Sequence, residues 1–208
     1  MEIKTGKFIV LDGPDGCGKS TQARRVADWL TGRGLDVVSY RDPGTTVVGE
    51  KIRRILLDPI HTTMTDGVEV LLYMAARAQL WAEHIGPDLQ AGRFVVMDRW
   101  LSSTCAYQGY AGRFGVEKVL DIAAAALKRM WPDATVILDV DAETARERMK
   151  RDLDRMEQKG GDYHARVRDG FVALEGLCPN LAVIDARPSV EQVHENIIHH
   201  LKAVLQWQ

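Results

Sequence analysis

A glycine-rich segment near the amino terminus has the residue types and spacing of a phosphate-binding loop. Residues 13–20 read GPDGCGKS and match G-x-x-x-x-G-K-[ST]; an apolar run at 8–11 precedes them and a helical pattern at 23–30 follows. Glycines let successive backbone N–H groups turn toward phosphate oxygens, and a helix N-terminus favours negative charge. A glycine-rich turn with an incidental lysine would need neither the strand nor the helix. The pattern predicts a nucleoside triphosphate site formed by Gly13, Pro14, Asp15, Gly16, Cys17, Gly18, Lys19, Ser20 and Thr21.

Two pairs of side chains are candidates for contact with the phosphates and a metal ion. Lys19 can reach the β- and γ-phosphate oxygens, and the hydroxyl of Ser20 can ligate Mg²⁺. Asp98 and Arg99 directly follow the apolar run at 94–97. Ligands of open α/β sheets bind at the carboxyl ends of strands, so we expect Asp98 to hold the Mg²⁺ water shell and Arg99 to reach an acceptor phosphate. The alternative is that Asp98 and Arg99 only pair with each other.

Arginines elsewhere in the chain favour a small anionic acceptor. An arginine is a planar donor suited to phosphate, and several that converge would form a pocket for a dianionic monophosphate. The sequence contains no Asn-Lys-x-Asp segment, which disfavours a GTP switch and favours a kinase. An arginine at the end of a strand is often only a surface charge, so Arg41 ranks lowest among the four candidates. They are Arg41, Arg53, Arg77 and Arg99.

Short apolar runs that alternate with helical patterns predict the scaffold. Each run is continuous, which is typical of a strand buried on both faces, and the alternation implies a parallel α/β sheet. Gly32 and Gly34 are expected to end the first helix, and Ser189 and Gln192 have capping-box spacing at the start of the last one. No repeat or linker marks a boundary, so residues 1–208 are expected to form one domain. The five runs are 8–11, 37–40, 94–97, 135–140 and 181–184.

Composition excludes several functions. The formal net charge of -2 provides no basic field for a polynucleotide, so no nucleic-acid partner is expected. No apolar run is long enough for a membrane span, and the first residues lack the apolar core of a signal peptide. The three cysteines have no metal-ligand spacing, and a reducing cytoplasm fits them best.

Residues 146–159 form the most highly charged stretch of the chain. One interpretation is a solvated helix face, because Glu147 and Arg151 are spaced i,i+4 and Asp152 and Arg155 are spaced i,i+3. The other is a mobile segment that brings cations to the phosphates, with Gly160 and Gly161 as its hinge.

Taken together, the motifs resemble those of the thymidylate kinase family. In chain order they are residues 13–21 (GPDGCGKST), 41–44 (RDPG), 50–53 (EKIR), 75–79 (AARAQ), 98–99 (DR) and 106–109 (AYQG), and the resemblance extends over essentially the whole chain. The family implies a three-layer α/β/α P-loop kinase fold with a five-stranded parallel sheet and a short helical lid at about 146–161. It also implies ATP as phosphoryl donor, Mg²⁺ as cofactor and dTMP as acceptor.

The resemblance assigns roles to residues of the acceptor site. It places Arg53, Arg77 and Arg99 at or near the acceptor phosphate, and Asp15 near the 3′-hydroxyl, which favours a deoxynucleotide. An aromatic residue at the position of Tyr73 stacks on thymine, although helical spacing alone fits a core aromatic equally well. Tyr107 is implied to lie near the deoxyribose, and Gln108 to read the pyrimidine edge.

The family has two forms, with the catalytic arginine either in the phosphate loop or in the lid. The loop here contains no arginine, so this chain resembles the second form. The candidates are Arg148, Arg151 and Arg155, of which Arg151 and Arg155 rank first. Members of the family are commonly homodimers, and apolar residues of a helix expected at 65–89 are suitable for such an interface, or equally for the core.

Four residues depart from the family pattern. Asp12 and Asp42 stand where glutamate is more common, Thr45 where a second glycine is common, and Trp100 where tyrosine or histidine usually follows Asp-Arg. Trp100 either narrows the acceptor pocket or packs against the helix that carries Tyr73. The alternative functions are a kinase for another nucleoside monophosphate or a deoxynucleoside, and an ATP-binding regulatory switch.

Overall fold

A five-stranded parallel sheet forms the centre of the molecule. The computed structural model describes residues 6–149 and 154–207. All strand pairs are parallel, and the order across the sheet is β2-β3-β1-β4-β5. The sequence prediction of five parallel strands is therefore confirmed. The strands are β1 (Phe8–Asp12), β2 (Val37–Arg41), β3 (Phe94–Asp98), β4 (Ala134–Asp139) and β5 (Leu181–Asp185).

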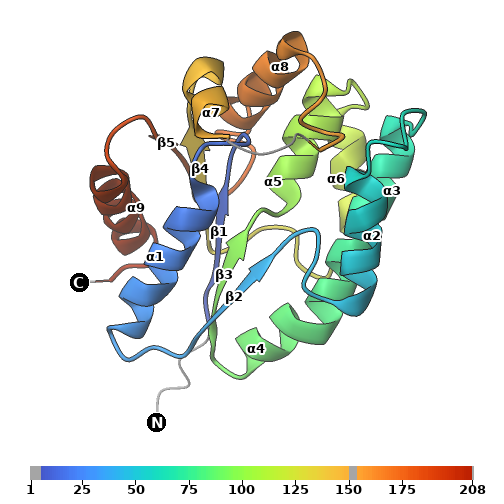
Figure 1. Cartoon of the computed structure of the whole chain (residues 1–208). Helices are drawn as coiled ribbons and strands as arrows, with labels where there is room; N and C mark the ends of the chain where they lie inside the picture. Colours follow the sequence, from blue (N-terminus) through green and yellow to red (C-terminus); the bar gives the residue numbers. More distant parts are fainter. Residues whose placement is uncertain (1–5, 150–153, 208) are drawn as a thin grey trace.

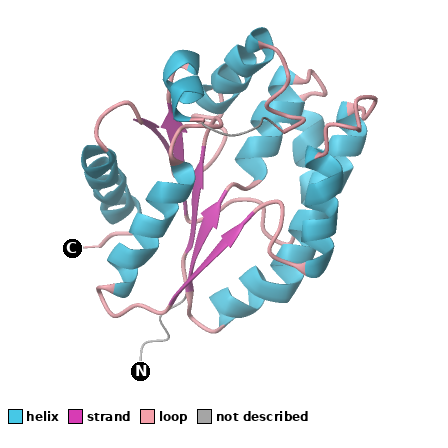
Figure 2. Cartoon of the chain, viewed as in Figure 1, coloured by secondary structure: helices cyan, strands magenta, loops and turns pink. Residues whose placement is uncertain are grey.

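Helices cover both faces of the sheet and complete the expected three layers (Figures 1 and 2). The first face carries α1 (Lys19–Thr31) and α9 (Val190–Val204). The second face carries most of the other helices. The exception is α7 (Ala142–Arg148), which lies above the sheet at its carboxyl edge. The helices of the second face are α2 (Val47–Leu57), α3 (Asp66–Leu80), the π-helix η1 (Trp81–Ile85), α4 (Gly86–Gln90), α5 (Leu101–Thr104), the π-helix η2 (Cys105–Ala111), α6 (Val116–Ala126) and α8 (Gly161–Val172).

Each face of the sheet has its own apolar core. Along β1, Phe8 and Val10 belong to one core and Ile9 and Leu11 to the other, as alternating side chains must. The expectation that every strand is buried on both faces holds for β1 and for most of β3 and β4. It is wrong for β2 and β5, which are only partly buried, because an outermost strand has one neighbour and less helix above it.

The predicted helix ends are largely confirmed. Gly32 caps α1, and Gly34 follows with a φ of 76°, in the left-handed region that glycine favours. The backbone N–H of Gln192 donates to Oγ of Ser189 at 3.2 Å, which caps α9. The helix expected at 65–89 is present as α3, η1 and α4 in succession, with a π-helical turn in the middle. In the part of the chain that the structure describes, no helix is long and apolar enough to cross a membrane.

Trp100 packs into the core and is absent from the walls of both cavities described below. Its side chain is fully buried, with ring centroids 5.2 Å from Phe8 and 6.4 Å from Trp81. The indole N–H donates to the carbonyl of Met130 at 2.8 Å, and the guanidinium of Arg77 lies 5.2 Å from the ring centroid. Of the two interpretations above, packing toward α3 is therefore the correct one, with Arg77 as the contact instead of Tyr73.

Replacement of Trp100 should destabilise the protein strongly. Trp100→Ala removes a buried aromatic side chain and should lower the free energy of unfolding by about 3–5 kcal/mol. Trp100→Phe retains most of the packing and should cost less. Leu177→Ala, at a side chain that is 56% exposed, is the control and should stay within about 0.5 kcal/mol of the parent. Urea denaturation followed by circular dichroism measures all three, and an unchanged midpoint for Trp100→Ala would contradict this packing.

Candidate active site

The loop between β1 and α1 has the backbone geometry of a phosphate cradle. Gly13, Gly16 and Gly18 all have positive φ, and α1 begins at Lys19. At Gly16, with φ of 78°, an added Cβ would lie 2.3 Å from the carbonyl oxygen of Ala145. Only glycine allows the loop to approach α7 this closely, and loop residues 15–20 line the cavity above α1.

Lys19 and Ser20 lie at the start of α1, where the sequence motif predicts them. Nζ of Lys19 donates to the carbonyl of Pro14 at 3.1 Å and lies 3.5 Å from the carboxylate of Asp15. Oγ of Ser20 donates to Oδ2 of Asp98 at 2.5 Å. This hydroxyl and carboxylate are hard oxygen ligands of the kind Mg²⁺ prefers, and Mg²⁺ commonly takes only one or two protein ligands beside phosphate and water. Ser20 and Asp98 therefore provide the kind of ligands that a Mg²⁺ site requires.

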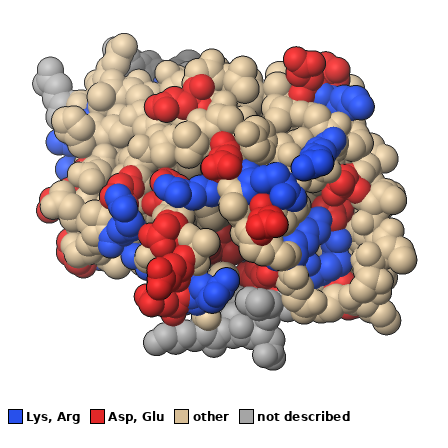
Figure 3. Space-filling model, turned by 90° about the horizontal axis from the view of Figure 1, so that it is seen from above, with Lys and Arg blue, Asp and Glu red and all other residues tan. Residues whose placement is uncertain are grey.

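A cavity of about 890 Å³ lies above the loop, at the carboxyl edge of the sheet. Charged side chains of both signs gather on this face of the molecule (Figure 3). The wall at one end is the phosphate loop with Asp98 and Arg99, and at the other end it is apolar. A polar end for phosphates and an apolar end for a base suit a nucleotide. The apolar end consists of Ala186, Pro188, Val190 and Val193.

A second, smaller cavity of about 80 Å³ adjoins the first. All six residues predicted to bind the acceptor line it: Arg53, Tyr73, Arg77, Arg99, Tyr107 and Gln108. Four residues, Asp15, Asp42, Arg53 and Arg99, line both cavities. The two cavities therefore meet at the carboxyl ends of β1, β2 and β3.

Arg99 lies at this junction in a constrained conformation. Its φ is 71°, which is unusual for a residue with a side chain, and its backbone N–H donates to the carbonyl of Leu11. Nη1 donates to the carbonyl of Gly13 at 3.0 Å and to Oγ of Ser103 at 2.9 Å. Nη2 donates to Oδ1 of Asp15 at 2.5 Å. The predicted alternative, pairing with Asp98, is not observed among the contacts of these two described residues.

Asp15 connects three functional groups. It accepts from Arg99 and from the hydroxyl of Tyr107 at 2.7 Å, and Lys19 is the third partner. Burial opposes ionisation of this carboxyl group, but Arg99 and Lys19 outweigh it and lower its pKa. Burial and the neighbouring Asp15 raise the pKa of Tyr107 well above its usual value. At neutral pH Asp15 is therefore an anion and Tyr107 a hydrogen-bond donor.

Asp12 organises the segment that carries Arg99, a role that the sequence analysis missed. Its carboxylate is fully buried and accepts from the hydroxyls of Ser102 and Ser103, both at 2.6 Å. It also accepts from the backbone N–H groups of Gly13 and Ser103, both at 2.9 Å, and lies 3.4 Å from Nη1 of Arg99. A carboxylate directly before the loop and two adjacent serines after Asp98-Arg99 were the available signals.

Arg77 is held by the protein itself more than it is directed at a ligand. Its side chain is 1% exposed. Nε donates to Oδ2 of Asp42 at 2.7 Å, and Nη2 donates to the carbonyl of Trp100 and to Oγ1 of Thr104, both at 3.1 Å. By contrast, Arg53 donates to the carbonyl of Pro43 at 3.1 Å and lines both cavities. Within the described part of the chain, Oδ1 of Asp42 is buried without a partner at the junction.

The lid candidates occupy different places. Arg148, at the end of α7, lines the larger cavity and donates to the carbonyl of Ala186 at 2.9 Å. Arg155 is instead buried against α2 and α3: it donates to Glu69 on α3 at 2.6 Å and to the carbonyl of Leu56 on α2 at 2.7 Å. The interpretation of 146–159 as a solvated helix face is therefore wrong for Arg155, since α7 ends at Arg148. Arg151 lies outside the described residues.

A P-loop, a parallel sheet of this strand order and two adjoining cavities define a P-loop nucleotide kinase. Comparison with known proteins gives the family. The family model described as thymidylate kinase matches residues 11–197. The chain therefore belongs to the thymidylate kinase family.

Individual relatives agree with the family model. The chain is 40% identical over 202 residues to the thymidylate kinase of Thermoanaerobacter sp. (strain X514), which covers 96% of this chain and 99% of the relative. It is 39% identical over 208 residues to the thymidylate kinase of Chromobacterium violaceum, covering 99% and 98%. The crystal structure of thymidylate kinase from Ehrlichia chaffeensis superposes with a TM-score of 0.77 at 29% identity, over 95% of this chain and 98% of that one.

Asp12→Asn tests the organising role of Asp12. The amide has one acceptor oxygen in place of two, so hydrogen bonds to the 99–103 segment are lost and Arg99 is no longer held at the junction. We expect a fall of at least about tenfold in kcat/KM together with a loss of about 1–3 kcal/mol in stability. Asp121→Asn on the exposed face of α6 is the control. Unchanged turnover and melting temperature in Asp12→Asn would contradict the assignment.

Proposed function

We propose that this chain transfers the γ-phosphoryl group of ATP directly to dTMP, giving ADP and dTDP. The observation that carries the proposal is the junction of the two cavities, where Asp15, Arg53 and Arg99 line both. A phosphoryl donor above the loop and an acceptor phosphate in the second cavity would meet there. The acceptor oxygen is already anionic, so positioning and charge stabilisation suffice and no strong general base is needed.

The donor site uses the start of α1. The loop N–H groups and Lys19 would bind the β- and γ-phosphates, and Ser20 and Asp98 would hold Mg²⁺. When bound, Mg²⁺ neutralises negative charge on the phosphates. The adenine would lie against the apolar end of the cavity, near Val190 and Val193.

The acceptor site would use the second cavity. Arg53 and Arg99 provide cationic donors for the monophosphate, with Arg77 fixing the wall behind them through Asp42. Tyr73 is only partly buried and faces the cavity, where its ring can stack on a pyrimidine. Asp15 and Tyr107, which line the cavity, would lie beside the deoxyribose, and Gln108 would contact the base.

We also propose a cellular location and an oligomeric state for the enzyme. We place it in the cytoplasm, where its three buried free thiols stay reduced, and we expect no polynucleotide partner. We also expect a homodimer, because α2 and α3 expose apolar side chains that a second copy would cover. These are Val47, Val48, Ile55, Val68 and Leu71.

An acceptor panel tests the function. ADP release with ATP·Mg²⁺ is measured against dTMP, dUMP, dCMP, CMP, dGMP, thymidine and water, and the product is identified by chromatography. Preference for dTMP with formation of dTDP supports the proposal. Preference for another acceptor would retain the kinase and refute the base pocket, whereas tight ATP binding without any phosphorylated product would indicate a regulatory switch.

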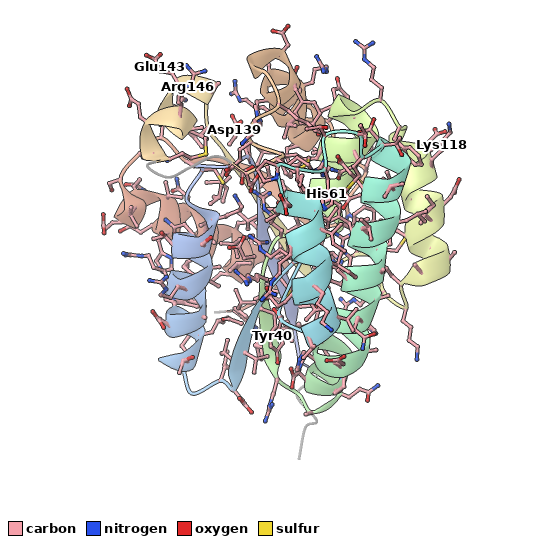
Figure 4. The ribbon with its side chains drawn as sticks, turned by 45° about the vertical axis from the view of Figure 1, so that its right-hand side comes forward. Tyr40, His61, Lys118, Asp139, Glu143 and Arg146 are labelled. Atoms are coloured by element: carbon pink, nitrogen blue, oxygen red, sulfur yellow. The ribbon has the colours of Figure 1, made fainter. Side chains whose placement is uncertain are left out.

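Lys19→Met should abolish turnover, because the loss of a cation at the transferred phosphoryl group costs about 10² to 10³-fold or more in kcat. The fold should remain, since the contacts of Lys19 with Pro14 and Asp15 are local to the phosphate loop. Lys118→Met, at an exposed position on α6 (Figure 4), is the matched control and should retain parental activity. Turnover by Lys19→Met at the parental rate would refute the phosphate-loop assignment.

Single substitutions of the lid candidates should have different effects on kcat and KM. Arg148 lines the donor cavity, so Arg148→Ala should lower kcat by about 10³-fold or more if it provides the lid cation. Arg155→Ala should instead reduce stability and raise KM for dTMP, because Arg155 is buried beside Glu69. Arg146→Ala is the control, since Arg146 lies at the outer edge of α7 (Figure 4). A large fall in kcat for Arg155→Ala alone would reverse this order.

A further inference from the structure

A buried polar cluster lies behind Gln108, one of the residues that line the second cavity. Its centre is Glu69 on α3, which is fully buried. The carboxylate accepts from Nε2 of Gln108 at 2.8 Å and from Nη1 of Arg155 at 2.6 Å, and Nζ of Lys159 lies 3.3 Å away. The family resemblance assigns Gln108 to the pyrimidine edge. Its amide nitrogen is in contact with the Glu69 carboxylate behind the cavity wall.

The anion determines which way the Gln108 amide points. An ionised carboxylate only accepts hydrogen bonds, so the amide must turn its NH₂ group toward Glu69. Its carbonyl oxygen then lies on the side of the cavity, and among the described residues this oxygen has no hydrogen-bond donor. Asn and Gln amides are otherwise free to turn over, so the position of the charge behind Gln108 is what fixes the acceptor.

A fixed carbonyl oxygen distinguishes pyrimidines by their ring nitrogen. Thymine and uracil carry an N–H at N3, which can donate to this oxygen, whereas N3 of cytosine carries a lone pair that would repel it. On the basis of the proposed function, we infer that Glu69 is a positioning residue that sets nucleobase specificity, because its charge orients Gln108 to accept from an imide N–H.

The same carboxylate ties the base end of the acceptor site to the segment that precedes α8. Arg155 and Lys159 lie in the turns before α8, and the hydroxyl of Tyr163 on α8 donates to the carbonyl of Tyr107 at 2.9 Å. Both cations lie against the fully buried Glu69 carboxylate, which would be costly to leave without partners. The orientation of Gln108 thus depends on a contact between α3 and a segment about 90 residues away in the chain.

Glu69→Gln is the direct test, because a neutral amide can pair with Gln108 in either orientation. The ratio of kcat/KM for dTMP to that for dCMP should fall by about 10 to 100-fold, mostly through KM. The ratio of dTMP to dUMP is the internal control and should not change, because both bases carry the N3–H. A ratio of dTMP to dCMP that stays at the parental value, with both acceptors weakened equally, would show a merely structural role and overturn the inference.

A second variant keeps the test decisive if Glu69→Gln leaves Arg155 buried without its anion and the protein fails to fold. Glu69→Gln with Arg155→Met removes both charges of the pair and replaces them with neutral groups of similar size. It should show the same fall in the dTMP to dCMP ratio. Gln108→Leu should lower that ratio too, and adding Glu69→Gln to it should cause no further fall, since the two residues act through one hydrogen bond. An additional fall in that combination would contradict the inference.

The parental protein separates this inference from the proposed function. If it does not phosphorylate dTMP at all, the proposed function fails. If it prefers dTMP and the variants keep that preference, the inference about Glu69 fails and the kinase assignment stands.

Discussion

The site depends on how the charge of the Arg99 guanidinium, whose side chain is only 15% exposed, is neutralised. A cation largely removed from water needs anionic partners close by, and Arg99 has two: Asp12 directly before the phosphate loop and Asp15 within it. The parallel register aligns Leu11 with Asp98, which brings the end of β3 beside the start of the loop. Sheet register, loop conformation and the junction of the cavities are thus linked by one set of ion pairs.

This arrangement explains why carboxylates occur in a site built for phosphates. Without nucleotides, the cations at the junction would repel one another, and Asp15 and Asp42 pair with Arg99 and Arg77. Burial raises the pKa of Asp42 despite Arg77, and Arg99 and Lys19 lower that of Asp15. Asp15 thus holds its cations in place as a fixed anion, a preorganisation that would reduce the rearrangement needed when phosphates arrive.

The sequence was sufficient for features that local pattern determines. The glycines and Lys19 lie within one motif, and the five apolar runs correspond to the five strands. Features that depend on distant contacts could not be predicted: Arg155 meets Glu69 across 86 residues, and only the fold reveals that it is buried. One pattern in the sequence pointed to Glu69: Glu69, Tyr73 and Arg77 are spaced i, i+4 and i+8 and so share a face of α3.

Departures from the family pattern were likewise interpretable only in three dimensions. The sequence leaves two places open for Trp100, the acceptor pocket or the packing toward α3, and in the structure its ring packs in the core against Phe8 and Trp81. Thr45 stands where glycine is common and has a φ of 68°, a conformation that costs a side-chain-bearing residue energy. Its N–H donates to Glu50 at 2.8 Å, and Glu50 also pairs with Arg41, the strand-end arginine ranked lowest as a ligand. A local hydrogen-bond network can therefore hold a backbone shape that glycine would otherwise provide.

The cluster around Glu69 shows how substrate selection can be built behind a binding wall. Gln108 faces the cavity, but the group that orients it is a charge on α3, and the cations that balance that charge come from the segment before α8. Such a network is favourable only when every member is satisfied, because each unpaired polar group would be buried away from water. Specificity for a base would then rest on the complete cluster, and the acceptor pocket could form fully only when α3, η2 and the segment before α8 are packed together.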